Sequence, residues 1–345
     1  MEGRLTQPGS AGARSIGRVL VTGATGFVGS ELCATLAGLG LEVRAMARRP
    51  FPSPGARITV VTAALEDEAA IRDAVDGIDA VVHLAGRVHV LRDHASEAEA
   101  YRRVNVEGTR LLAECALDAG ARTFVLASTV KVMGEGSPVR YIETMPPAPA
   151  DAYAESKLQA EALVRQLARQ RGVHAPILRL PLVYGPRVTG NMLRLFAQVC
   201  RGLPLPLGAV RNQRSLLYLG NLCAAIPAVL EPSQRTDRVF FLSDGHDLST
   251  PQLIRLIGAA LGKPARLVPV PPTLFRLAGR VGDAIDRLRP FPLTSQAADR
   301  LLGSLTVDST AFTSATGYRP PYSVEEGLKA TANWYLARRT TGEGP

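Results

Sequence analysis

Short apolar runs alternate with segments of helical periodicity along the first half of the chain. The apolar-rich runs lie at 19–21, 42–47, 58–61, 80–86 and 123–127. Strands that are buried on both faces of a parallel sheet show such runs, and helices connect them. The pattern therefore predicts an α/β fold, a Rossmann-like doubly wound parallel sheet with ligands at the carboxyl ends of its strands.

Proline-rich connectors mark a change of composition in the second half. The segments 203–207 and 268–272 are such connectors, and amphipathic stretches lie around 253–257, 274–277 and 324–328. They predict a smaller C-terminal mixed α/β lobe, with the active site in the cleft between the two parts. The expected divisions are a flexible tail at 1–16, a dinucleotide-binding Rossmann domain at 17–186, a mainly substrate-binding region at 187–337 from which one strand or helix can return to the first domain, and a flexible tail at 338–345.

The composition argues against several classes of function. The chain of 345 residues has a formal net charge of +9, but its basic residues are almost all arginines and are scattered along the sequence. This distribution does not predict a nucleic-acid partner and favours anionic small molecules. No run of 18 apolar residues predicts a membrane span, and the leader lacks the apolar stretch of a signal peptide. Four cysteines without a C-x-x-C pair are expected to be buried thiols of a cytoplasmic protein, and no metal site is predicted.

A glycine-rich turn follows the first predicted strand. Gly23, Gly26 and Gly29 are spaced by three residues and precede a segment with helical periodicity. The first glycine allows the tight turn, the second lets the backbone approach a pyrophosphate, and the third lets the helix pack on the strand. The free N–H groups of the helix then face the phosphates. The turn predicts a dinucleotide site.

The end of the second predicted strand indicates which dinucleotide binds. An acidic residue there favours NAD, whereas an arginine accommodates the 2′-phosphate of NADP. This chain has Arg48 and Arg49 and no acid at that point. NADP(H) is therefore the favoured cofactor. NAD(H) is the alternative if both arginines are solvated loop residues that do not contact the cofactor.

Three residues predict proton transfer. Tyr153 and Lys157 are four residues apart and share one face of a predicted helix, and Thr129 ends a predicted strand. An ammonium group beside a phenol favours the phenolate and lowers its pKa. The three residues could move a proton at a carbinol oxygen while a nicotinamide moves a hydride. The alternative is an ordinary surface pair. His83 lies inside an apolar run and is expected to be a core histidine.

The sequence resembles the extended short-chain dehydrogenase/reductases of the NAD-dependent epimerase/dehydratase family, from about Gly17 to Leu336. The resemblance implies that Tyr153 is the acid/base, that Lys157 orients the nicotinamide ribose and tunes Tyr153, and that Thr129 has the usual Ser/Thr role. The motifs that carry it are 22–29 (TGATGFVG), 83–86 (HLAG), 105–109 (NVEGT), Tyr153 with Lys157, and 179–186 (RLPLVYGP). The cofactor-binding residues that it implies are Gly23, Thr25, Gly26, Phe27, Val28, Arg48, Leu65, Leu84, Ala85, Gly86, Tyr153, Lys157, Pro181 and Val183.

Further segments are similar to nucleotide-sugar C4 reductases and epimerases of bacterial polysaccharide pathways. They are 128–135 (STVKVMGE), Gly190 with Asn191, and 213–218 (QRSLLY). By this resemblance Arg214 pairs with the nucleotide pyrophosphate, Asn191 lines the nucleotide site, and Thr129 and Lys131 belong to the substrate-binding residues. A homodimer is also implied.

The chain departs from the family pattern at several positions. Ala63 and Ala64 replace a common Gly-Asp pair, so that adenine recognition falls to backbone and apolar contacts there. Leu182 stands where 4-epimerases and 4,6-dehydratases often have asparagine, and no acidic pair follows Thr129, which disfavours dehydration. The favoured function is C4-keto reduction of a UDP- or dTDP-sugar. A C4-epimerase, a ketoreductase of a non-nucleotide carbonyl compound and a non-catalytic NADP sensor remain as alternatives.

Overall fold

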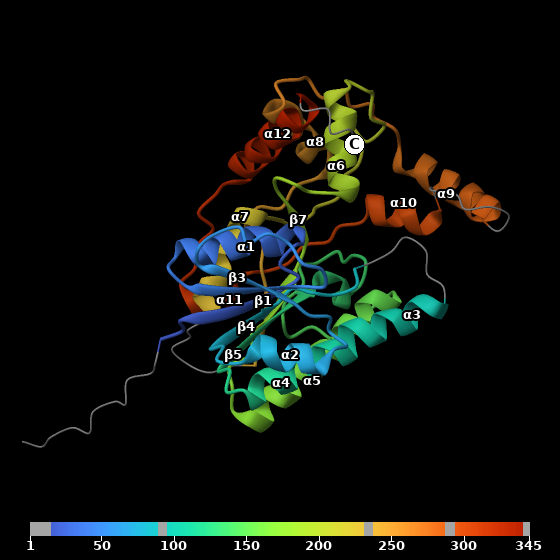
Figure 1. Cartoon of the computed structure of the whole chain (residues 1–345). Coiled ribbons are helices and arrows are strands. Elements are labelled where there is room, and N and C mark those ends of the chain that lie inside the picture. The colour runs from blue at the N-terminus through green and yellow to red at the C-terminus, as the bar shows by residue number, and fades with distance from the viewer. Residues whose placement is uncertain (1–14, 89–94, 231–236, 287–293, 341–345) are drawn as a thin grey trace, which may run out of the picture.

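A parallel sheet forms the centre of the molecule (Figure 1). The computed structural model describes residues 15–88, 95–230, 237–286 and 294–340. Seven strands of the described residues pair in parallel in the order β3-β2-β1-β4-β5-β6-β9. The strands are β1 (Arg18–Thr22), β2 (Glu42–Ala47), β3 (Ile58–Thr62), β4 (Ala80–His83), β5 (Thr123–Thr129), β6 (Ile177–Leu180) and β9 (Val239–Phe241). The strands predicted in the first half are confirmed.

Helices cover both faces of the sheet, which confirms the doubly wound fold (Figure 1). One face carries α1 (Phe27–Gly38), α7 (Leu219–Ala225) and α11 (Thr310–Thr316); the other carries α2 (Glu68–Val75), α4 (Gly108–Asp118) and α5 (Ala152–Arg171). Successive side chains of a strand point to opposite faces. Accordingly, Val19 and Val21 of β1 belong to the core under α1, and Leu20 belongs to the core under α4 and α5.

Two pieces of the second half complete this sheet. β9 pairs with β6 through Ile177–Val239, Leu178–Phe240 and Arg179–Phe241. Phe312 of α11 lies in the same buried cluster as Val19 and Val21. The predicted dinucleotide-binding part of the fold therefore includes residues from both halves of the sequence.

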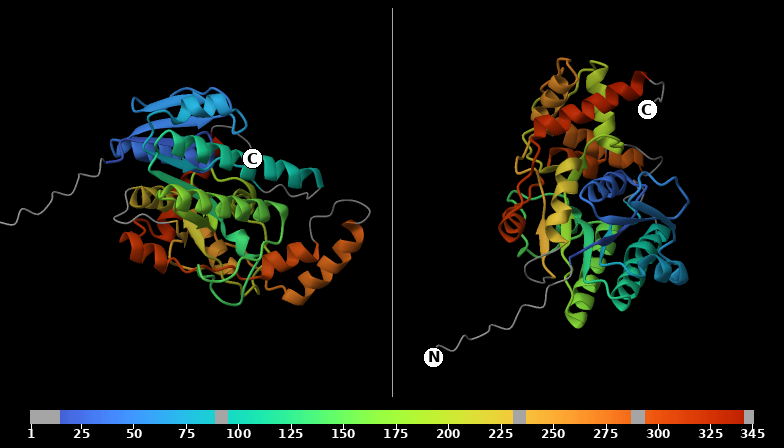
Figure 2. Two further views of the ribbon diagram at one scale, coloured as in Figure 1. Left: turned by 90° about the horizontal axis from the view of Figure 1, so that it is seen from below. Right: turned by 60° about the vertical axis from the view of Figure 1, so that its left-hand side comes forward.

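The C-terminal lobe lies against one end of the sheet, as the two views of Figure 2 show. Its core joins Phe196, Ile254 and Leu328 from three helices. These are α6 (Gly190–Cys200), α8 (Thr250–Ala260) and α12 (Val324–Thr340). The short parallel strands β7 (Leu182–Tyr184) and β8 (Leu216–Tyr218) pair next to them. The helices α9 (Pro272–Asp286) and α10 (Ser295–Leu302) form a hairpin beside this core.

The chain ends differ in part from the expected tails. Ile16, placed in the N-terminal tail, is buried in the core under α1. α12 continues to Thr340, so that residues 338–340 are helical. Residues 1–14 and 341–345, which make up the rest of the two predicted tails, lie outside the described residues.

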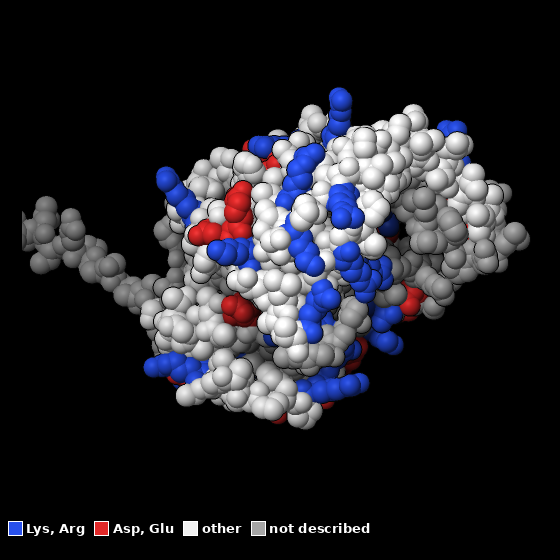
Figure 3. Space-filling view, turned by 90° about the horizontal axis from the view of Figure 1, so that it is seen from above, with Lys and Arg blue, Asp and Glu red and all other residues white. Residues whose placement is uncertain are grey.

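The structure can be compared with the expectations from composition for the cysteines, for membrane-spanning helices and for surface charge. The four cysteines are free and buried, as expected. None of the helices in the described ranges is both long and apolar enough to cross a bilayer. On the face of the molecule seen in Figure 3, basic side chains are scattered among uncharged ones, and a few acidic side chains lie beside them.

Candidate active site

The glycine-rich turn connects β1 to α1 as the sequence predicts. Gly23 has a φ of +70°, a conformation that favours glycine. A Cβ on Gly29 would lie 2.2 Å from the carbonyl oxygen of Gly23, so the helix packs closely on the turn. Gly26 is exposed and is the N-cap of α1. The exposed N-terminus of α1, without a capping side chain, fits the phosphates of a dinucleotide.

The end of β4 lies directly beside this turn. The Ala85 amide donates to Thr22 Oγ1 at 3.1 Å, and a Cβ on Gly23 would lie 3.0 Å from the Ala85 nitrogen. Phe27, Val28 and Leu84, which the resemblance implies for the cofactor, are partly exposed members of one apolar cluster. Val183 belongs to the same cluster. The structure therefore brings these predicted cofactor residues together at the carboxyl edge of the sheet.

His83 is a core histidine, as expected. Its ring nitrogens lie 2.7 Å from Thr22 Oγ1 and 3.0 Å from Thr109 Oγ1. Because Thr109 donates its proton to the Asn105 carbonyl, Nε2 of His83 must be the donor to Thr109. Burial first and Lys157 second lower the pKa of His83 to about 3, so the ring is neutral.

The three predicted catalytic residues converge at the same edge. Thr129 is the last residue of β5, and Tyr153 and Lys157 lie in the first half of α5. Asp151 caps this helix by accepting from the Ala154 amide at 2.8 Å. Thr129 and Tyr153 share a hydrogen bond, which acts to lower the pKa of the phenol. Lys157 is buried, with 6% of its surface exposed.

The predicted direction of the Tyr153 pKa shift is wrong. Burial first, and then the Asp151 carboxylate, raise the pKa of Tyr153 to about 12. Burial likewise lowers the pKa of Lys157 to about 8, although Glu161 acts to raise it. Desolvation disfavours the charged form of either group, and here it outweighs the attraction that the spacing suggests.

Asn105 joins the end of β4 to the catalytic helix. It lies in the π-helix η1 (Arg102–Glu107) and is buried. Its side chain accepts from the Arg87 amide at 2.8 Å and donates to the Ser156 hydroxyl at 3.0 Å. Ser156 in turn donates to the Tyr153 carbonyl at 2.7 Å. Asn105 was part of a family motif without a role of its own, and the structure shows that it positions the first turn of α5.

An ion-pair network extends from the catalytic residues to the C-terminal lobe. Lys131 Nζ lies 2.8 Å from Asp151 Oδ2 and 3.3 Å from Glu135 Oε1. Glu135 pairs with Arg300 of α10 at 3.0 Å. Arg214 donates to the Arg300 carbonyl, and burial lowers the pKa of Arg214. The structure thus brings Lys131 and Arg214 into one network, and it adds Glu135 and Arg300, which the sequence did not single out.

The other predicted residues lie apart from this network. Arg48 is exposed just after β2, and within the described ranges no hydrogen bond or ion pair engages it. Leu65 is buried against Gly108, so that it has little side-chain surface to offer adenine. Pro181 is buried, and Asn191 is exposed in the first turn of α6. The binding roles of these four residues remain predictions.

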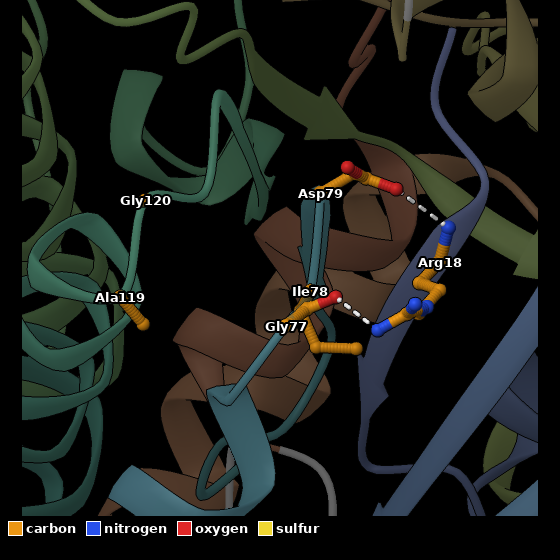
Figure 4. A pocket seen from close by; sticks show the side chains of 6 residues that line it. All are labelled: Arg18, Gly77, Ile78, Asp79, Ala119 and Gly120. Carbon is orange, nitrogen blue, oxygen red and sulfur yellow. Dashed lines mark hydrogen bonds between the residues drawn. The ribbon is translucent and has the colours of Figure 1, made fainter. Parts of the chain in front are cut away.

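A polar pocket of about 210 Å³ lies at the opposite, amino-terminal edge of the sheet (Figure 4). Asp79 accepts from the Arg18 amide at 2.9 Å, and the Arg18 guanidinium donates to the Gly77 carbonyl at 3.2 Å. Its lining is Arg18, Gly77, Ile78, Asp79, Ala119 and Gly120. Since Arg18 and Asp79 bond to the chain itself and lie away from Tyr153, this pocket is not the predicted site.

The glycine-rich turn and the Thr129–Tyr153–Lys157 set at one edge of a doubly wound sheet define a dinucleotide-dependent enzyme of the short-chain dehydrogenase type. Residues 19–241 match the "NAD dependent epimerase/dehydratase family". The chain belongs to this family, as the sequence motifs predict.

Relatives of known name cover nearly the whole chain. It is 34% identical to a UDP-glucose 4-epimerase of Vibrio cholerae over 328 residues, 92% of this chain and 95% of that protein. It is 28% identical to the N-acetyl-alpha-D-glucosaminyl-diphospho-ditrans,octacis-undecaprenol 4-epimerase of Escherichia coli O157:H7, covering 92% and 94%. Among solved structures, MoeE5 in complex with UDP-glucose and NAD is 26% identical with a TM-score of 0.74, covering 94% and 100%.

Proposed function

We propose that this chain is a nucleotide-sugar oxidoreductase that transfers a hydride at C4 of a UDP- or dTDP-sugar. The observation that carries the proposal is the hydrogen-bonded Thr129–Tyr153 pair with Lys157 on the same helix face, beside the glycine-rich turn. The names of the relatives support a nucleotide-sugar substrate.

Each of the three residues has a distinct part in this chemistry. Tyr153 gives its proton to the C4 oxygen in reduction and takes it back in oxidation. Thr129 holds the same oxygen through its hydroxyl, and Lys157 donates to the nicotinamide ribose and favours the phenolate. The bound nicotinamide supplies or accepts the hydride. Because the pKa of Tyr153 is raised to about 12, the phenol is protonated at neutral pH and is ready to donate.

The diphosphate of the substrate is assigned to Arg214 and Arg300. Arg214 is held against the backbone of Arg300, and Arg300 pairs with Glu135. Guanidinium groups bind phosphate oxygens with several donors in a fixed geometry. Lys131 lies two residues after Thr129 and is assigned to the sugar.

Two overall reactions fit this site. Net C4-keto reduction is the first candidate, because Arg48 and Arg49 suit NADP(H), which a reductase consumes and exchanges. The exposed Leu182 also replaces the asparagine that epimerases often have. C4-epimerisation is the second candidate, supported by the 34% identical UDP-glucose 4-epimerase and by the NAD in the MoeE5 complex. An epimerase regenerates its cofactor and needs no exchange.

Cofactor preference separates the two candidates. NADPH is expected to bind roughly 10–100-fold more tightly than NADH, because one or more charge-assisted bonds of about 1.5–3 kcal/mol join Arg48 to the 2′-phosphate. Arg48→Ala should remove most of this difference and leave NADH binding unchanged, as measured by coenzyme fluorescence. Arg211→Ala, a change at an exposed arginine that is not assigned to the cofactor, is the control and should leave the preference unchanged. A wild-type preference for NADH would favour the epimerase and make Arg48 a solvated loop residue.

Substrate class is tested by thermal shift with UDP-, dTDP- and GDP-sugars. A ligand that binds only the folded state raises the apparent stability. The wild-type chain should respond to a UDP- or dTDP-sugar, whereas Arg214→Ala should lose that response and keep its response to coenzyme. Arg211→Ala, an exposed arginine three residues earlier, is the control. Equal responses in wild type and Arg214→Ala would place Arg214 outside the substrate site, and no response to any nucleotide sugar would contradict the proposed function.

A further inference from the structure

A buried ion pair lies beneath the catalytic residues. Glu161 and Arg179 have side chains only 2% and 4% exposed. Arg179 Nη2 donates to Glu161 Oε2 at 2.7 Å, and its Nε donates to Oε1 at 3.1 Å. The Ser128 hydroxyl also donates to Glu161 Oε1. The carboxylate is therefore held by three donor groups from two strands.

The pair is placed directly behind the proposed active site. Tyr153, Lys157 and Glu161 follow one another at four-residue intervals on α5, so they share one face of the helix. Ser128 immediately precedes Thr129 in β5, and Arg179 lies opposite Ser128 in β6. Glu161 thus contacts the segment that carries Thr129 and lies one turn from Lys157.

A buried ion pair is weak evidence of a contribution to stability. Its desolvation cost often exceeds the attraction between its charges, and an apolar pair of similar volume can be as stable. Arg179 is further fixed by the ring of Phe241 at 5.6 Å. The Glu161 carboxylate is therefore an anion held in a fixed position next to the helix turn that carries Lys157.

The groups around Lys157 leave Glu161 to balance its charge. His83 on β4 is neutral, and Tyr153 on α5 keeps its proton at neutral pH. Arg179 on β6 is cationic and adds no negative charge. Among the described residues, the Glu161 carboxylate is the anion that acts on the buried Lys157 ammonium.

We propose that Glu161 is a positioning residue: its carboxylate, fixed by Arg179 and Ser128, keeps the buried Lys157 in its cationic form for coenzyme binding and proton transfer. The role at the coenzyme rests on the proposed function. The effect of Glu161 on the charge of Lys157 does not depend on the proposed function.

The composition of the chain allows a direct test. Only Lys131, Lys157, Lys263 and Lys329 are lysines, so NMR of a chain labelled at lysine Cε resolves few resonances, and Lys157→Met assigns the one of interest. Lys157 should titrate near pH 8 in wild type. In Glu161→Gln the midpoint should fall by roughly one unit, because an anion that favours the charged form has been removed.

Two further variants keep the test clear of misfolding. Glu161→Gln/Arg179→Met removes both charges of the pair and should show a smaller downward shift than Glu161→Gln, because the Arg179 cation no longer disfavours the charged form of Lys157. Glu155→Gln changes an exposed glutamate of the same helix and should leave the midpoint unchanged. An unchanged midpoint in both Glu161 variants would overturn the proposal.

Coenzyme binding measured over the same pH range connects the charge to function. NADPH fluorescence should show affinity falling as Lys157 loses its proton, at a lower pH in Glu161→Gln than in wild type. A shift in the NMR midpoint without a matching shift in binding would overturn the role of Glu161 at the coenzyme. An NMR shift in a chain that binds no nicotinamide coenzyme at any pH would instead overturn the proposed function and leave the charge assignment standing.

Discussion

Tyr153→Phe is expected to lower turnover by roughly 10²–10⁴-fold, the usual contribution of a positioned acid–base group. The change removes only the phenolic oxygen, so the ring should keep its contact with Tyr101, whose centroid lies 5.8 Å away. The coenzyme should therefore still bind, and thermal stability should stay close to wild type. The measurement is steady-state turnover of a substrate identified by product analysis.

Two comparisons make this result specific. Thr129→Val should cost less, because Thr129 orients the oxygen and does not carry the transferred proton. The pH profile gives a second check: oxidation needs the phenolate and should speed up as pH rises, whereas reduction needs the phenol and should slow down. Full activity of Tyr153→Phe on a verified substrate would contradict the mechanism and reopen the non-catalytic alternative.

Arg179→Met is expected to lower the free energy of unfolding by roughly 3–5 kcal/mol, because it leaves the buried Glu161 carboxylate without its cation. Urea denaturation near neutral pH measures this loss. The loss should shrink as pH falls, since protonation of the orphaned carboxyl removes the uncompensated charge. Adding Glu161→Gln should recover most of the stability.

A surface pair that includes Arg169 of α5 provides the control. Arg169 pairs with Asp237 at 2.7 Å, but its side chain is largely exposed. Exposed pairs typically contribute about 0–1 kcal/mol, so Arg169→Met should have little effect. If Arg179→Met lowered the free energy of unfolding no more than Arg169→Met does, the expected cost of leaving the Glu161 carboxylate without its cation would be contradicted.

The sequence predicted those features that depend on neighbouring residues. Gly23 and Gly29 could be assigned roles because the turn and the helix contact lie within one short segment, and the structure agrees. The apolar run around His83 predicted a core histidine, and its burial and hydrogen bonds agree. Strand order beyond simple alternation was left open, because pairing of β9 with β6 joins distant segments.

The features that were missed depend on three-dimensional contacts. Arg300 and Glu135 are far apart in sequence, and they meet because α10 lies over the segment after β5. The sign of the Tyr153 pKa shift was wrong because spacing shows which charges are near and does not show how much water is excluded. Burial likewise separates Glu161 from the many exposed glutamates of the chain.

The late position of β9 has a consequence for the order of folding. β6 lacks its outer neighbour until residues 239–241 have been synthesised, and the cluster of Val19 and Val21 lacks Phe312 for longer still. At about 5–20 residues per second, the incomplete sheet persists for seconds on the ribosome, with β6 as an open edge that can pair with another chain. Since the sheet is completed only by β9, the seven-stranded sheet cannot form before residues 239–241 have been synthesised.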